Sequence, residues 1–259
     1  MRLTKRLILF MVSILLIVGE AGCMSTEDKV LNYLEDKYHQ KFEIEGVKKG
    51  SLFFSQMYGG DKVTVHSKEN PEIVFLVEED SEENGVYYDN YVLAKWAEEL
   101  KGKLAADIEK ELPPGSPYKI LVYVAPDKYD KSMVNMDFED YLNNVNRDFK
   151  IVVKVGIKTA GEPDVNLYNQ NIFNLYNLVK KLGTERYAVS VGFVDRADNI
   201  SDYIRTAYVN NIPWSNLKAR VFGEIILNDR HDPLNGSADQ DWRITGPEKV
   251  IDHYTSMEE

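Results

Sequence analysis

A proline-rich stretch divides this 259-residue chain into two parts. Residues 113–117 read Pro-Pro-Gly-Ser-Pro, which fits neither a helix interior nor a central strand, because proline has no backbone N–H and a fixed φ. We place a domain boundary there. The chain before it favours a small domain of helix plus antiparallel meander, and the chain after it alternates strands and helices. The fold class predicted is therefore α+β, with an α/β second half.

The elements expected before the boundary begin with a helix over residues 28–38, where Ser25 and Asp28 resemble a capping box. Short strands follow at 42–47, 51–57, 63–67 and 72–77, separated by glycine- and asparagine-containing turns. Asp89 is expected to cap a second helix that ends at Pro113. Its apolar stripe consists of Leu93, Trp96, Leu100, Leu104, Ile108 and Leu112.

After the boundary, strands are expected over 118–124, 151–157, 187–194 and 219–227, with helices over 138–145, 164–182 and 200–208. From Asn228 onward the polar, Gly- and Pro-containing sequence predicts a loosely packed tail. The predicted division is a leader at 1–22, an α+β domain at 23–113, an α/β domain at 114–235 and a polar tail at 236–259.

The first 23 residues have the organisation of an export signal. Arg2, Lys5 and Arg6 precede an apolar run over residues 7–19, the length of a signal-peptide core. As a helix the run would cover roughly 20 Å, less than the ~30 Å hydrocarbon core that a transmembrane helix must cross. Basic residues before the run favour export of the rest of the chain.

Ala21-Gly22-Cys23 ends the leader, and Cys23 is the single cysteine of the chain. The sequence resembles the lipobox of bacterial lipoproteins, in which a signal peptidase cuts between residues matching Gly22 and Cys23 after the thiol has received diacylglycerol. Glu20 departs from the aliphatic residue usual in that family. Two alternatives stay open: an ordinary signal peptide cut after Ala21, and an uncleaved anchor.

The lipobox resemblance implies lipidation of Cys23 and a location on the extracytoplasmic face of the cell membrane, with membrane lipid as one partner and a membrane or envelope protein as a possible second. Residues 36–43, followed by short strands and Asp89-Asn90-Tyr91, are similar to uncharacterised lipoproteins of Gram-positive bacteria. That similarity implies class and location, and no activity.

Charge excludes one class of partner. The chain carries a formal net charge of −11, and the net charge without residues 1–22 is −13. Nucleic acid phosphates demand the opposite sign, so we expect no nucleic-acid binding. Once Cys23 is lipidated no disulfide can form, so the fold depends on packing, with 16 tyrosines and 10 phenylalanines supplying much of the buried area.

Catalytic and cofactor motifs are missing from the sequence. His39, His66, His231 and His253 are scattered and form no i,i+4 pair, which favours isolated histidines over a zinc site. No Walker loop, Gly-x-Gly-x-x-Gly or Gly-x-Ser-x-Gly occurs. We expect no cofactor and lean toward a protein that is not an enzyme.

Two local patterns are candidate sites. Oxygen-bearing side chains at Asp232, Asn235, Asp239 and Asp241 surround Gly236, as a weak Ca²⁺ site would require, or as a polar Asx-turn loop would. Residues 87–91 and 166–177 are dense in Tyr and Asn, the chemistry of protein or glycan contacts, although such tyrosines also pack at element edges.

The function expected is a non-enzymatic binding or interaction module at the cell surface. The alternative is a cell-envelope hydrolase whose site is assembled in three dimensions from carboxylates or histidines. A cleft of converging titratable groups would favour the hydrolase, and an aromatic groove would favour the binding module.

Overall fold

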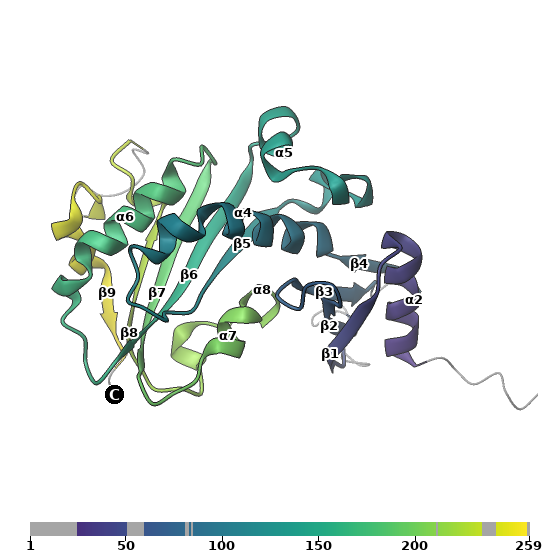
Figure 1. The fold of residues 1–259 in the computed structure, drawn as a ribbon, viewed down its shortest axis with the longest axis horizontal. Coiled ribbons are helices and arrows are strands. Elements are labelled where there is room, and N and C mark those ends of the chain that lie inside the picture. The colour runs from purple at the N-terminus through teal and green to yellow at the C-terminus, as the bar shows by residue number, and fades with distance from the viewer. Residues whose placement is uncertain are drawn as a thin grey trace, which may run out of the picture.

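The computed structural model describes residues 25–50, 60–80, 83, 85–210, 212–234 and 242–257. These residues form two sheets that lie side by side (Figure 1). The first sheet has the strand order β1-β2-β3-β4, and the second has the order β5-β6-β7-β8-β9. The predicted α+β class is confirmed.

The strands are β1 (Phe42–Lys48), β2 (Lys62–Ser67), β3 (Val74–Glu79), β4 (Tyr87–Asp89), β5 (Tyr118–Val124), β6 (Phe149–Thr159), β7 (Arg186–Asp195), β8 (Val221–Asn228) and β9 (Tyr254–Ser256). The α-helices are α2 (Thr26–Tyr38), α4 (Tyr91–Glu109), α5 (Phe138–Asn144), α6 (Asn169–Lys180), α7 (Ser201–Arg205) and α8 (Ala207–Asn210). Short 3₁₀ helices occur at Pro126–Lys128, Lys131–Asn135, Val165–Leu167, Trp214–Asn216, Asp229–His231 and Pro247–His253.

The first sheet is the predicted antiparallel meander, with α2 packed against β1. Ser25 caps α2 by accepting a hydrogen bond from the Asp28 backbone N–H, as its position before the helix predicts. The expected strand at 51–57 lies outside the described residues. The short strand β4 was missed: Asp89, expected as a helix cap, is its last residue, and Asn90 occupies the N-cap position of α4.

The second sheet is mixed. β6 and β7 are parallel and are connected through α6, whereas every other neighbouring pair in the sheet is antiparallel. A parallel pair requires a crossover, and an amphipathic helix that covers the sheet supplies one. Here α6 buries Ile172, Leu175 and Val179. The alternation of strands and helices in the sequence therefore corresponds to one β-α-β unit within a mainly antiparallel sheet.

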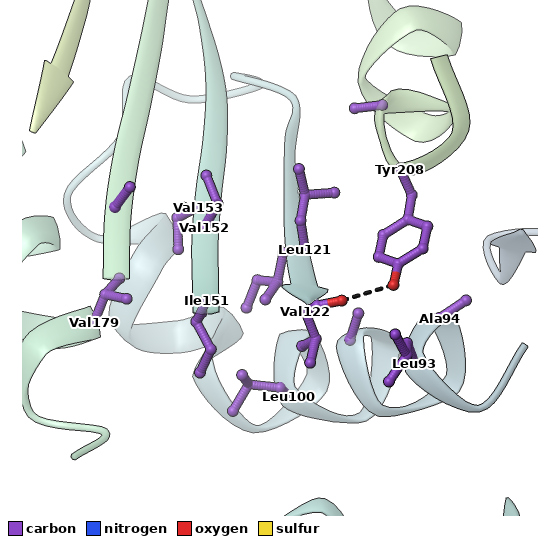
Figure 2. Packing of buried hydrophobic residues seen from close by; sticks show 14 of the residues in the cluster. Leu93, Ala94, Leu100, Leu121, Val122, Ile151, Val152, Val153, Val179 and Tyr208 are labelled. Carbon is purple, nitrogen blue, oxygen red and sulfur yellow. Dashed lines mark hydrogen bonds between the residues drawn. The ribbon is translucent and has the colours of Figure 1, made fainter. Parts of the chain in front are cut away.

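One hydrophobic core continues through both parts of the described chain, from Val30 on α2 to Val250 near the C-terminus. Helix α4 connects them, because it contacts both β3 and β5. In Figure 2, Leu93 and Leu100 of α4 lie near Val122 and Ile151, and the Tyr208 hydroxyl donates to the Val122 carbonyl at 2.6 Å. Since the core does not stop at the prolines, the division into two domains at 113 stays a prediction.

Ion pairs and hydrogen bonds also join the two sheets. Arg205 of α7 contacts both carboxylate oxygens of Glu45 on β1, each at 2.7 Å. The buried Lys119 of β5 donates to the Glu72 carbonyl at 2.6 Å. Burial lowers the pKa of Lys119 to about 8, because desolvation disfavours the ammonium form.

Two helices expected to be continuous are interrupted. In place of one helix over 164–182, Asp164 caps the 3₁₀ turn Val165–Leu167, and α6 begins at Asn169. The helix expected over 200–208 breaks at Thr206 between α7 and α8. The Thr206 hydroxyl donates to the Asp202 carbonyl at 2.8 Å. Such local side-chain bonds compete with regular helix geometry.

The loosely packed tail expected after Asn228 is wrong for the residues that are described. β9 pairs with β8 and forms the edge of the second sheet. Val250 is fully buried and Ile244 nearly so, and the turn Pro247–His253 contacts α6. Sparse apolar residues in a polar segment are sufficient here because the surface that they cover comes from α6 and β8.

Gly192 in β7 gives the first testable prediction. A Cβ built there would lie 2.4 Å from two ring atoms of the buried Trp214. Gly192→Ala is therefore expected to lower the free energy of unfolding by about 2 kcal/mol through overpacking, as measured by urea denaturation. Gly161→Ala is the control, because a Cβ there meets nothing within 4 Å. Equal effects of the two substitutions would contradict the steric explanation.

No helix in the described part of the chain combines the length and the apolar character needed to cross a membrane.

Candidate functional site

A cavity of about 640 Å³ runs beside β4, where the two halves meet. We call it the Asp89 cleft. One wall comes from α2, β3 and β4, and the opposite wall from the 3₁₀ turns after β5. Its lining residues are Lys37, Tyr38, Leu76, Glu78, Tyr87, Tyr88, Asp89, Asn90, Pro126, Tyr129, Asp130 and Lys131.

Asp89 is one of the lining residues, and its side chain is fully buried. Its Oδ2 accepts from the Tyr33 hydroxyl at 2.9 Å and from Lys37 Nζ at 2.7 Å. Its Oδ1 accepts from the Tyr38 hydroxyl at 2.7 Å and from the Tyr91 backbone N–H at 3.1 Å. Four donors therefore surround one anion, so its charge is both paired and hydrogen-bonded.

The arrangement fixes the tyrosines as hydrogen-bond donors. Burial, followed by the adjacent Asp89 carboxylate, raises the pKa of Tyr33 and of Tyr38 well above the ordinary range. Both hydroxyls thus keep their protons at neutral pH. A carboxylate has about four acceptor positions, and those of Asp89 are occupied. Asp89 cannot act as a general base because its acceptor positions are occupied, and the two tyrosines cannot because they keep their protons.

Lys37 connects the buried network to the open cleft. Its side chain is about one quarter exposed, and its Nζ contacts the Tyr33 hydroxyl as well as Asp89. The ammonium also lies 5.1 Å from the Tyr33 ring centre and 5.2 Å from that of Tyr38, within cation–π range. These contacts hold the lysine in one position at the cleft surface.

The aromatic walls of the cleft come from both halves of the protein. Tyr88 of β4 is 60% exposed. Tyr129, from the segment after β5, donates to the Asp89 carbonyl at 3.4 Å, and burial raises its pKa to about 12. The cleft is thus open and partly aromatic, with a rigid polar floor.

The tyrosine-rich segment 87–91 therefore contributes to the cleft, since four of its residues line it while Tyr91 enters the core. Segment 166–177 does not. It forms most of α6, where Tyr176 is buried and Asn171 and Asn174 both donate to Glu111. Lys37 and Tyr129 were missed, because no local pattern links them to residues 87–91.

The predicted calcium loop is only partly described. Asp232 is buried, and its carboxylate accepts from Lys180 at 2.6 Å and from the Tyr187 hydroxyl at 2.5 Å. Asn235, Asp239 and Asp241 lie outside the described residues. Within the described ranges, no cluster of three or more metal-ligating side chains occurs. The calcium site stays a prediction, and so does lipidation at Cys23, which is also outside the described residues.

Two histidines that are distant in the sequence lie together. The rings of His231 and His253 have centres 4.3 Å apart, beside a cavity of about 240 Å³ that Glu224 also lines. The sequence did not predict this contact, because the two histidines are 22 residues apart and form no local motif. The other two are apart from them: His39 ends α2 with φ 56°, and His66 Nδ1 lies 2.8 Å from Glu45.

His253 gives a pH prediction. Burial first, and then His231, lowers its pKa to about 4 from about 6.5 in an unfolded chain. Between these pH values the unfolded state binds a proton that the folded state does not, so stability falls as the pH falls through this window. We expect a loss of roughly 2 kcal/mol from pH 7 to 5, measured by urea denaturation. His253→Phe should flatten that part of the profile. An unchanged profile would contradict the assignment.

Comparisons with known proteins identify a similar fold but do not identify a function. No family model matches the chain, and no curated protein matches it. A solved structure that is similar is the crystal structure of a DUF5037 family protein from Ruminococcus gnavus ATCC 29149. It is 14% identical, with a TM-score of 0.51, over 79% of this chain and 90% of that one. At this identity the likeness shows the fold alone.

Proposed function

We propose that this chain is a lipid-anchored protein on the extracytoplasmic face of the cell membrane, and that its folded part is a non-enzymatic module that binds its ligand in the Asp89 cleft. The leader and Cys23 support the anchor. The binding role is supported by a cleft of ligand size, whose tyrosine-lined wall is fixed by a buried and fully hydrogen-bonded carboxylate.

The main observation behind the proposal is that the acceptor positions of the Asp89 carboxylate are all hydrogen-bonded. A general base needs an unoccupied lone pair within reach of its substrate, and the acceptor positions of Asp89 are taken by Tyr33, Lys37, Tyr38 and the Tyr91 N–H. A pre-organised wall lowers the entropy lost when a ligand binds. The cleft is therefore better suited to holding a ligand than to transforming one.

The anchor is tested by intact-mass analysis of the mature protein from membranes, beside a Cys23→Ala variant. We expect wild type to begin at an acylated Cys23, and the variant to be released from the membrane or left unprocessed. A mature protein that begins at Gly22 with a free thiol would contradict the anchor, because the ordinary signal peptide would then be the correct alternative.

The binding site is tested by replacing Tyr88 with the photo-crosslinking residue p-benzoylphenylalanine in intact cells. Leu167, which is 71% exposed and distant in the sequence from the cleft residues, is the control position. We expect an adduct that forms from position 88 and not from 167. If both positions give the same adducts, or neither gives any, the cleft is not a binding site.

A further inference from the structure

We propose that the ligand of the Asp89 cleft is an extended peptide segment that adds a strand to the outer edge of β4, which pairs with no second strand among the described residues. This inference rests on the proposed function and names its ligand class. In strand addition, main-chain hydrogen bonds supply affinity and side-chain pockets supply specificity. The mode requires an edge strand whose outward main-chain groups face an open groove.

The register of β4 shows which main-chain groups face outward. The Asp80 N–H bonds to the Val86 carbonyl at 2.8 Å, and the Asn90 N–H bonds to the Leu76 carbonyl at 3.3 Å. Hydrogen-bonded and non-hydrogen-bonded pairs alternate along an antiparallel ladder. Residues 86, 88 and 90 therefore bond toward β3. The N–H and C=O groups of Tyr87 and Asp89, which oppose Glu79 and Val77, point to the free edge.

The cleft surrounds this edge. Tyr88 projects from one face of the strand, and Tyr87 and Asp89 from the other, because side chains alternate along a strand. All three line the cleft, and Pro126, Tyr129 and residues 130–131 form the facing wall. The volume of about 640 Å³ falls within the range of 300–1,000 Å³ typical of ligand pockets. A groove with one strand edge as its wall accepts an extended chain.

Tyr129 lies at the outer edge of β4, which agrees with the outward direction of the Asp89 carbonyl. Its hydroxyl donates to the Asp89 carbonyl at 3.4 Å, a long contact compared with the usual 2.7–2.8 Å for a hydroxyl donor. A peptide N–H could replace this weak donor at little cost. The hydroxyl would then move aside toward the open cleft.

The opposite edge of the same sheet has the features that protect an edge from pairing. β1 is interrupted by a register shift between Ile44 and Gly46, and exposed or half-buried charged side chains alternate along it. Bulges and charges are common protections of edge strands. The described pairing of β4 has no such shift. β4 has three residues, so it offers main-chain groups to a short extended segment, and of these two edges it is the one that lines the cleft.

The apolar surface of the cleft narrows the choice of peptide. The charged lining residues do not select a sign, because Lys37 is paired with Asp89 and the exposed Lys131 is next to Asp130. Tyr88 and Pro126 supply apolar surface on the same cleft. The complementary peptide therefore has an aromatic or aliphatic side chain that packs on this surface.

The test pairs two substitutions at one position. Tyr87→Pro and Tyr87→Ala both remove the ring, but only proline removes the outward N–H, and proline is tolerated in edge strands. The probe is a library of random 12-residue peptides displayed on phage, selected on folded wild-type protein. Selected peptides should bind Tyr87→Pro about tenfold more weakly than they bind Tyr87→Ala, because the two variants differ in the N–H and not in the missing ring.

Amide hydrogen exchange by NMR gives a second readout on wild type. A bound peptide should slow exchange at the Tyr87 and Asp89 N–H groups. Failure to select any peptide, equal affinity for the alanine and proline variants, or unchanged exchange at both amides would each overturn strand addition. If the adduct at position 88 is a glycan or a small molecule, the peptide is wrong while the binding function stands. If no adduct forms, the proposed function falls as well.

Discussion

Replacing Asp89 by alanine is expected to lower the free energy of unfolding by about 3 kcal/mol. The substitution removes the one acceptor shared by Tyr33, Tyr38 and Lys37. It leaves two buried hydroxyls and an ammonium without a counter-charge, and an unpaired buried polar group costs its full desolvation. The value is toward the lower end of the range for broken buried pairs because Lys37 is about one quarter exposed and can turn to water. Urea denaturation at pH 7 measures it.

Asp107→Ala is the matched control for this loss. Asp107 pairs with Lys110 at 2.8 Å on the exposed face of α4, and such a surface pair contributes at most a few tenths of a kcal/mol. A double-mutant cycle of Asp89→Asn with Lys37→Met should give a coupling energy above 1 kcal/mol. If Asp89→Ala falls within 1 kcal/mol of wild type, the carboxylate does not organise the cleft wall.

Trp96→Ala is expected to lower the free energy of unfolding by about 4 kcal/mol. Trp96 is 1% exposed, its ring centre lies 4.3 Å from that of Tyr141, and its indole N–H donates to the Met136 carbonyl at 2.9 Å. The substitution removes a large apolar volume and leaves a buried carbonyl without this donor. Leu167→Ala, at an exposed position, should change stability by less than 0.5 kcal/mol.

The same variant tests whether the halves unfold together. Because one core continues through both sheets and α4 contacts β3 and β5, wild type should show a single transition when followed by fluorescence and by circular dichroism. Trp96→Ala should shift that transition as a whole. Two transitions, of which only one moves, would instead support separate domains divided near residue 113.

Local pattern in the sequence was sufficient for the regular elements. The strand expected at 118–124 has the observed bounds of β5, and the stripe from Leu93 to Ile108 lies on α4 as its spacing predicts. Ser25 caps α2 because capping depends on neighbours within three residues. The short strand β4 was not predicted, because three residues cannot display a period. The proposed lipid anchor is inferred from the sequence of residues 1–23 alone.

Contacts between distant segments decided the rest. The sequence predicts Asp89 as a helix cap. In the structure its carboxylate also accepts hydrogen bonds from the Tyr33 and Tyr38 hydroxyls, which are more than 50 residues away. The C-terminal segment reads as polar, yet Val250 is buried. Sequence pattern reports which face of an element is apolar, while desolvation and hydrogen bonding depend on what is packed against that face. Periodicity therefore predicted the elements, and only the tertiary structure could form the cleft between them.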